Sequence, residues 1–301
     1  MARYNVLQRN SYILNNYVLR RRKIPFLASF KLSYKCNLTC EQCPFHCMEA
    51  EDPGFGDVLD TLERLYARGN RIIIFEGGEP MLWRDGEHSI HDVIEQAKKR
   101  FFCVGMTTNG TIPLDVPTDI LWVSIDGFEE THNRLRGKDI FNRIIKNIKD
   151  SPHPKIFAHI TVNSQNHMQV PGLIEFLSTL VKGVSIQFYY PYNHKDALFL
   201  DLQTRGKLLN EVISMKASGY PVMNSRSSLE AMKWNEWQCA DWLIDNANPD
   251  GSLSQGCYLK GRDDIDCRKC GFTPHAEASL AHQGNLGAIK AGIDIFFKDM
   301  S

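Results

Sequence analysis

Short apolar segments alternate with amphipathic segments from residue 27 to about residue 218. The apolar segments are rich in Ile, Val, Phe and Leu, as buried strands are, and the segments between them carry apolar residues at helical spacing. The pattern predicts strands at Leu27–Ser33, Arg71–Glu76, Phe102–Thr107, Ile120–Ile125, Lys155–Asn163 and Val184–Tyr189. It predicts helices at about 56–68, 88–100, 139–150, 169–181 and 201–218.

Alternation of strands and helices favours βαβ units and a parallel sheet. Six units predict an α/β fold, a partial (β/α)6 TIM-like barrel, in which functional side chains gather at the carboxyl ends of the strands. After about residue 220, tryptophans and cysteines replace the alternation. We therefore expect a barrel at 27–220 and a small cysteine-rich extension at 221–301, with a last helix at about 285–298.

A basic helix is expected ahead of the barrel, at 1–26. Its apolar residues recur at near-helical spacing, and Arg20, Arg21, Arg22 and Lys23 follow them. One interpretation is a helix that docks on the barrel and ends in a solvated basic turn. The alternative is peripheral contact with a membrane that carries anionic lipid.

Charge and composition exclude several classes of protein. The 35 basic and 35 acidic residues cancel, so no basic field favours nucleic acid. No apolar run reaches the roughly 18 residues of a membrane span, and no secretory signal is recognisable. We therefore expect a cytoplasmic protein, in which spaced cysteines indicate metal binding or catalysis rather than disulfides. The isolated Cys103 lies in an apolar run and is expected to be a small buried hydrophobe.

Three cysteines follow the first predicted strand, as Cys36-x3-Cys40-x2-Cys43. Three thiolates on one tight loop satisfy three irons of a [4Fe–4S] cluster and leave the fourth iron open to another ligand. A structural zinc site is an alternative, with His46 or Cys47 as its fourth ligand. Cys47 would also complete an all-cysteine cluster.

Polar and glycine-rich segments follow the next strands. Glu76-Gly77-Gly78-Glu79-Pro80 ends the second strand, and its glycines permit positive φ and a close approach of exposed backbone amides and carbonyls to a ligand. Asn109 lies in an Asn-Gly turn after the third strand. Ser124 and Asp126 share one face of the fourth strand. Arg134 and Arg136, farther on, are either surface charges or ligand contacts.

The cysteine loop together with the Gly-Gly-Glu-Pro segment resembles the radical S-adenosylmethionine (SAM) superfamily. The resemblance implies a barrel of the radical SAM type, whose open iron binds SAM through its amino and carboxylate groups. A one-electron reductant such as flavodoxin or ferredoxin would reduce the cluster, and SAM would yield a 5′-deoxyadenosyl radical. Gln42 departs from the aromatic residue common before the third cysteine. The cofactor-binding residues that the resemblance implies are Gly77, Gly78, Glu79, Pro80, Asn109, Ser124 and Asp126.

Four more cysteines lie in the extension, at Cys239, Cys257, Cys267 and Cys270. Four thiolates suit either zinc or a [4Fe–4S] cluster. Gly251 predicts a hairpin turn between the first two. The layout resembles a twitch domain, the shortened SPASM extension, which implies an auxiliary [4Fe–4S] cluster. The tail also resembles hopanoid-biosynthesis radical SAM enzymes.

These resemblances imply a radical SAM enzyme that modifies an unactivated carbon. The first substrate hypothesis is an isoprenoid lipid or another small molecule, after the hopanoid-type tail and the basic helix. The second is a peptide or protein, as for many twitch and SPASM enzymes. A non-catalytic iron–sulfur or zinc protein is the alternative from another class, although such a protein would not need the glycine loop or Ser124.

Overall fold

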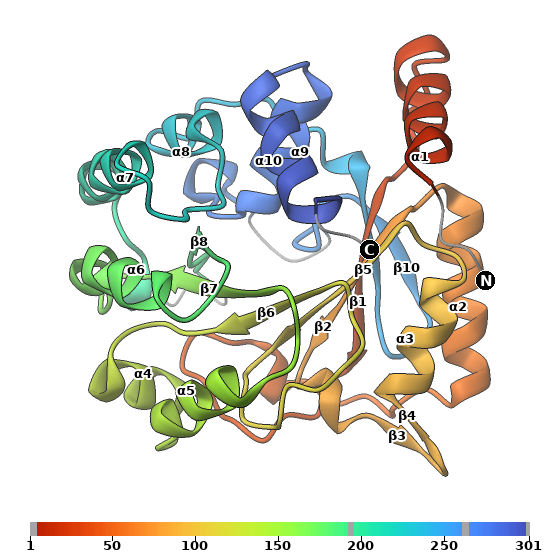
Figure 1. Cartoon of the computed structure of the whole chain (residues 1–301), viewed down its shortest axis with the longest axis horizontal. Coiled ribbons are helices and arrows are strands. Elements are labelled where there is room, and N and C mark those ends of the chain that lie inside the picture. Colours follow the sequence, from red (N-terminus) through yellow and green to blue (C-terminus); the bar gives the residue numbers. More distant parts are fainter. Residues whose placement is uncertain (1–4, 192–195, 261–264, 299–301) are drawn as a thin grey trace.

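The structure, a computed structural model, describes residues 5–191, 196–260 and 265–298. Parts of the predicted N-terminal helix and extension, at 1–4, 261–264 and 299–301, lie outside these ranges. An open eight-stranded sheet forms the centre (Figure 1). Its strands are, in spatial order, β10 (Leu253–Gln255), β9 (Ile244–Ala247), β1 (Leu27–Ser33), β2 (Ile72–Gly77), β5 (Cys103–Thr108), β6 (Ile120–Ser124), β7 (Ile156–Val162) and β8 (Gly183–Phe188). Neighbouring strands are parallel except for β9 and β10.

Helices from α2 to α7 follow one another around the outside of the sheet (Figure 1). They are α2 (Phe55–Arg68), α3 (Ile90–Lys98), α4 (Glu129–Arg136), α5 (Phe141–Asp150), α6 (Val170–Ser178) and α7 (Leu202–Ala217). The chain then forms α8 (Arg226–Met232), α9 (Thr273–His282) and α10 (Leu286–Phe296). A separate small hairpin pairs β3 (Arg84–Asp85) with β4 (His88–Ser89).

The predicted α/β architecture is confirmed, with the six expected strands at their expected places. The sheet is open and larger than expected, because β9 adds to β1 as a seventh parallel strand. The predicted turn at Gly251, with φ of 74°, joins β9 to β10. Helix α4 was not predicted, since Leu135 is the one apolar residue in its eight.

The two faces of the sheet are lined differently. Alternate residues such as Phe30, Phe75 and Val123 face the outer helices and belong to the main apolar core. On the inner face, Ile74 and Trp122 form a second apolar cluster that the end of α10 covers. Cys103 is fully buried in this inner cluster, as predicted. The amino end of the inner face is therefore closed, and the carboxyl end holds the polar residues described below.

The N-terminal helix is shorter than predicted. It comprises α1 (Val6–Ile13) and a π-helical segment (Leu14–Leu19), and it ends before Arg21, which has a φ of 47°. Tyr12 docks it on the domain by donating a hydrogen bond to the Gly69 carbonyl (2.6 Å). The basic residues that follow the helix are exposed.

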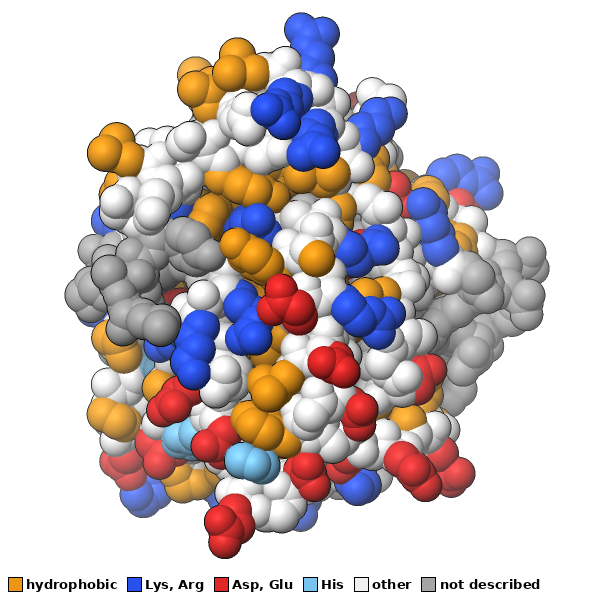
Figure 2. All heavy atoms as spheres, turned by 90° about the vertical axis from the view of Figure 1, so that its right-hand side faces the viewer, with side chains coloured by type: hydrophobic (Ala, Val, Ile, Leu, Met, Phe, Trp, Pro, Cys, Tyr) orange, Lys and Arg blue, Asp and Glu red, His pale blue; other side chains and the backbone are white. Residues whose placement is uncertain are grey.

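One apolar face of this helix stays outside the core, because Leu7, Leu14 and Val18 are exposed. On the side of the molecule shown in Figure 2, hydrophobic and basic side chains gather in the upper part and acidic ones in the lower part. Among the described residues, no helix combines the length and the apolar character that crossing a bilayer requires.

Candidate functional site

Cys36, Cys40 and Cys43 lie on the loop that follows β1, at the carboxyl edge of the sheet. The Cys43 amide donates a hydrogen bond to the Cys40 carbonyl (3.2 Å). Burial raises the pKa of Cys36, and raises that of Cys43 to about 11, and negative charge at Cys40 contributes to both. Desolvated neighbouring thiols resist becoming three thiolates unless a cation replaces their protons. This donor set fits the three-cysteine side of a [4Fe–4S] cluster.

The alternatives with His46 or Cys47 involve a short 3-10 turn, Phe45–Cys47, in which Cys47 is exposed. No three His, Cys, Asp or Glu side chains within the described ranges converge as the ligands of a single metal ion do.

The glycine segment after β2 holds the cysteine loop. The Gly78 amide donates to the Ser33 carbonyl (2.7 Å), and the Glu79 amide donates to the Lys35 carbonyl (2.8 Å). A Cβ on Gly78 would lie 2.2 Å from the Lys35 oxygen. The expectation that the backbone amides of the two glycines are exposed to a ligand is therefore wrong for Gly78, because the Ser33 carbonyl accepts the hydrogen bond of this amide.

Gly77 has the positive φ that this segment requires, at 118°. A Cβ at this position would lie 2.5 Å from the Ser33 carbonyl oxygen, so a side chain would be excluded by space as well as by conformation. Pro80 follows as the buried first residue of a 3-10 turn, Pro80–Leu82.

The fully buried carboxylate of Glu79 joins two turns of the site. Its carboxylate accepts hydrogen bonds from the Asn109 amide (2.7 Å), the Thr108 hydroxyl (2.9 Å) and the Met81 amide (3.1 Å). Burial raises the pKa of Glu79 to about 6, although these donors oppose the shift. The carboxylate thus fixes the turn after β5 against the turn after β2.

We expect Glu79→Gln to lower the free energy of unfolding by about 1–3 kcal/mol, because an amide nitrogen would face buried donors and leave one unpaired. Chemical denaturation measures this change. Glu63→Gln is the matched control, since Glu63 is largely exposed and pairs with Arg100 on the surface, where such a change costs less than about 0.5 kcal/mol. Equal effects of the two substitutions would contradict the anchoring role of Glu79.

Asn109 positions the first cysteine. Its side-chain amide donates to the Asn37 side-chain oxygen (2.8 Å) and lies 3.8 Å from the Cys36 sulfur. Its own oxygen accepts from the Thr111 hydroxyl (2.6 Å), which leaves its donors directed toward the cysteine loop.

Asp126 is buried at the centre of a charged network behind the same loop. Its carboxylate pairs with Arg136 (2.5 Å) and accepts hydrogen bonds from the Gln42 side chain (2.5 Å) and the Thr161 amide (2.9 Å). Arg136 in turn lies 3.9 Å from the Cys40 sulfur. Of the two arginines considered from the sequence, Arg136 is therefore a largely buried neighbour of the cysteine loop, with 11% of its side chain exposed, whereas Arg134 is exposed.

Ser124 is the last residue of β6. It lies on the inner face, because Trp122, two positions earlier in the strand, belongs to the inner cluster. Polar side chains continue across the carboxyl end of this face. Lys31 pairs with Glu76 (3.3 Å), and His159 shares a hydrogen bond with the Ser185 hydroxyl (2.9 Å). This polar inner wall adjoins the cysteine loop and the glycine segment.

The four cysteines of the extension influence one another electrostatically. Burial raises the pKa of Cys239 to about 12, with further contributions from Asp241, Cys270, Cys257 and Cys267. The Phe188 amide donates to the Gly271 carbonyl (3.0 Å), and this bond places the Cys267–Cys270 turn beside the end of β8. Four thiols near one another leave open either metal considered from the sequence.

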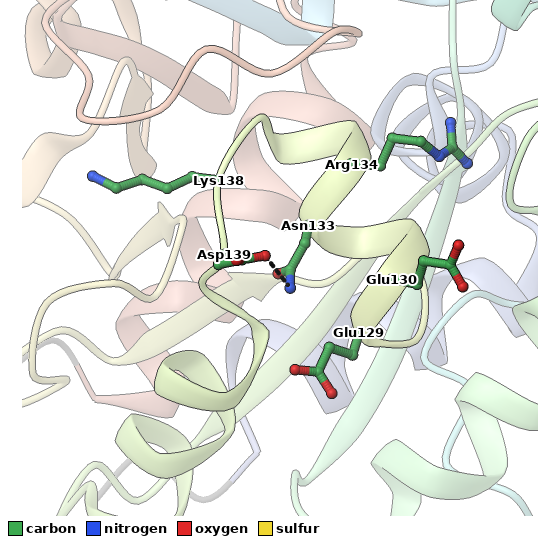
Figure 3. A pocket seen from close by; sticks show the side chains of 6 residues that line it. All are labelled: Glu129, Glu130, Asn133, Arg134, Lys138 and Asp139. Carbon is green, nitrogen blue, oxygen red and sulfur yellow. Dashed lines mark hydrogen bonds between the residues drawn. The ribbon is translucent and has the colours of Figure 1, made fainter.

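An open hollow lies along α4 and the turn that follows it (Figure 3). Its lining is polar and largely exposed, and the Asn133 side chain donates to Asp139 (3.1 Å) across it. The lining residues are Glu129, Glu130, Asn133, Arg134, Lys138 and Asp139. Of these, only Arg134 was considered from the sequence as a ligand contact, and the lining contains no cysteine.

A parallel sheet with three cysteines on the loop after its first strand defines a class of iron–sulfur proteins that bind a ligand at an open iron. Residues 30–176 match the family model described as the Radical SAM superfamily. Residues 30–176 therefore form a radical SAM domain, and proteins of this superfamily use a [4Fe–4S] cluster and SAM.

Similar proteins agree with this assignment. Fe-coproporphyrin III synthase of Methanosarcina barkeri (strain Fusaro / DSM 804) is 26% identical over 207 residues, which are 63% of this chain and 48% of the synthase. The structure of Streptococcus suis SuiB bound to S-adenosylmethionine has a TM-score of 0.66 and 14% identity, over 92% of this chain and 67% of that one. Native anSMEcpe with bound AdoMet and Kp18Cys peptide has a TM-score of 0.60 and 18% identity, over 87% of this chain and 83% of that one.

The two structural likenesses concern the fold, because their sequence identities are low. The chain spans about half the length of curated relatives that it matches, 48% for the synthase.

Proposed function

We propose that this protein reductively cleaves SAM and uses the 5′-deoxyadenosyl radical to modify an unactivated carbon of a substrate. The observation that carries the proposal is the loop of Cys36, Cys40 and Cys43, fixed by backbone hydrogen bonds between the segment 33–35 and the glycine segment. When bound there, a [4Fe–4S] cluster would supply the electron for SAM cleavage. A one-electron donor such as flavodoxin or ferredoxin would serve as the reductant.

The test is formation of 5′-deoxyadenosine by anaerobically reconstituted protein with dithionite and SAM. If the iron-loaded protein forms none, the proposal fails and the non-catalytic iron–sulfur or zinc protein takes its place.

The protein's own residues would hold the cofactor from several strand ends. Gly77, Gly78 and Pro80 shape the segment beside the cysteine loop, and Glu79 and Asn109 fix its geometry. Ser124 faces the inner wall, where a polar cofactor would lie. The Asp126 carboxylate already has three partners, and this favours a role in holding Arg136 and Gln42 in place.

A polar substrate fits the inner wall better than an isoprenoid. Lys31, Glu76 and His159 lie on this wall, and an apolar ligand would have to cover the partly exposed Glu76 carboxylate without offering it a hydrogen bond. A peptide is one such polar substrate, and anSMEcpe has been solved with a bound peptide. Coupling of SAM cleavage to candidate substrates tests this choice, since turnover with an isoprenoid alone would refute it.

The lipid hypothesis keeps one observation in its favour. Leu7, Leu14 and Val18 are exposed on the N-terminal helix, and exposed arginines follow them. Such a helix suits the interface of an anionic membrane. A membrane-bound substrate would then reach the protein from the side of the helix.

We also propose that Cys239, Cys257, Cys267 and Cys270 hold an auxiliary [4Fe–4S] cluster. The electrostatic influence of these thiols on one another supports a four-thiolate site, and the twitch-like spacing favours iron over zinc. Four protein ligands would close the cluster to substrate, which suits electron transfer or a structural role.

Iron analysis of the Cys36/Cys40/Cys43→Ala variant tests the second site. We expect about four irons per chain to remain after anaerobic reconstitution. In this background, Cys257→Ala is expected to lose the remaining iron and to lower thermal stability. Cys103→Ala is the matched control, because Cys103 is buried in the apolar inner cluster away from both sites and should leave iron unchanged. Zinc in place of iron would refute the auxiliary cluster.

A further inference from the structure

Arg205 is a fully buried cation in the first turn of α7. Its guanidinium lies over the Phe188 ring, 4.4 Å from the ring centroid. One terminal nitrogen, Nη1, donates to the Cys270 carbonyl (2.7 Å) and approaches the Asn235 side-chain oxygen (3.4 Å). Arg205 therefore contacts the backbone of one of the four cysteines in the extension.

The rest of the guanidinium has no partner within the described ranges. Both Nε and Nη2 are buried and lack a hydrogen-bond acceptor. The carboxylate of Asp201, the N-cap of α7, attracts the guanidinium but does not accept a hydrogen bond from these two atoms. Arg136 offers a comparison inside the same protein, because it is paired with the buried Asp126. A buried charge without a counterion is costly, so an unmatched arginine indicates that an anionic group belongs beside it.

Cys270, whose backbone Arg205 contacts, and the other three cysteines of the extension would provide such a group as thiolates on iron. A [4Fe–4S] cluster with four thiolates is anionic and becomes more so when it is reduced, and its sulfurs accept hydrogen bonds. Burial lowers the pKa of Arg205 to about 10, and a negative charge on Cys270 would oppose this shift.

We propose that Arg205 is the positioning residue that matches the charge of the auxiliary cluster and raises its reduction potential. The proposal rests on the proposed function of the four cysteines. The free N–H groups of Arg205 would donate hydrogen bonds to the sulfurs of the cluster. The positive charge of Arg205 would stabilise the reduced cluster more than the oxidised cluster, because the reduced cluster is more negative. Arg205 would thereby help the auxiliary cluster to accept an electron.

The experiment uses the Cys36/Cys40/Cys43→Ala protein, in which the auxiliary cluster alone remains, and compares Arg205→Gln with Arg205→Lys. Glutamine keeps a donor for the Cys270 carbonyl but removes the charge, whereas lysine keeps the charge. We expect Arg205→Gln to shift the midpoint potential of the auxiliary cluster to a more negative value. A redox titration monitored by EPR measures this potential. It should also retain iron about tenfold less well against a chelator. Arg205→Lys should stay close to the parent in both measurements.

Arg268→Gln is the matched control, because Arg268 adjoins Cys267 in sequence but its side chain is exposed and pairs with Asp266. Solvent screens that charge, so the potential should not change. Unchanged potential and iron retention in folded Arg205→Gln would overturn the role of Arg205, as would equal shifts in the glutamine and lysine variants. Absence of iron from the parent triple variant would instead refute the auxiliary cluster itself.

Discussion

Cys40→Ala is expected to reduce 5′-deoxyadenosine formation to the background without enzyme. Cys40 is the buried middle member of the three cysteines and lies next to Arg136. Loss of its thiolate would leave two protein ligands for the cluster, which are too few to hold a cube with one open iron. Chromatographic measurement of 5′-deoxyadenosine after anaerobic reduction with dithionite gives the result directly.

The matched control for this experiment is Cys47→Ala. Cys47 lies four residues beyond Cys43 and is exposed, so its removal should leave SAM cleavage intact. Cleavage that survives in Cys40→Ala would exclude this loop as the cluster site. Loss of cleavage in Cys47→Ala would instead make Cys47 a ligand.

Gly78→Val is expected to prevent assembly of the SAM-binding cluster. A Cβ at this position would lie 2.2 Å from the Lys35 carbonyl oxygen, and backbone atoms cannot yield as the end of a flexible side chain can. The displaced segment is the one that leads directly into Cys36. We therefore expect the variant to lose about half of its iron, that of one cluster in two, together with all SAM cleavage.

Gly56→Ala provides the control, because Gly56 lies in α2 with open space around the position of a Cβ. Alanine there should keep all the iron and raise stability slightly, since glycine is a poor residue within a helix. A Gly78→Val protein with full iron and only a weaker affinity for SAM would show that Gly78 approaches the ligand rather than the cysteine loop.

The spacing of apolar residues predicted the amphipathic helices and the fully buried strands. The strand Leu27–Ser33 was predicted with its observed bounds, because an apolar run between a basic segment and the first cysteine leaves little choice. Helix α4 was missed, since its charged sequence shows no apolar face. Strand β9 was missed because Ile244–Ala247 is short and contains Asp245 and Asn246.

Only part of the candidate site could be predicted from the sequence. Spacing along the chain identified the cysteines and the glycine segment, but it did not indicate which groups those residues contact. The backbone amides of Gly78 and Glu79 donate to the backbone carbonyls of Ser33 and Lys35, and no pattern of side chains encodes such contacts. Arg205 lies far from any cysteine in sequence, and its approach to Cys270 depends on the packing of α7 against the end of β8.

The pairing of β9 with β1 has a consequence for how the chain is made. Leu27 pairs with Ile244, so the strand that leads into the SAM-cluster cysteines lacks one neighbour until most of the protein has left the ribosome. During synthesis, the free side of β1 is an unpaired edge that can join other chains. Contacts so distant in sequence also form slowly. A cell that makes this protein should therefore benefit from chaperones that shield nascent edges, and insertion of the first cluster should follow completion of the chain.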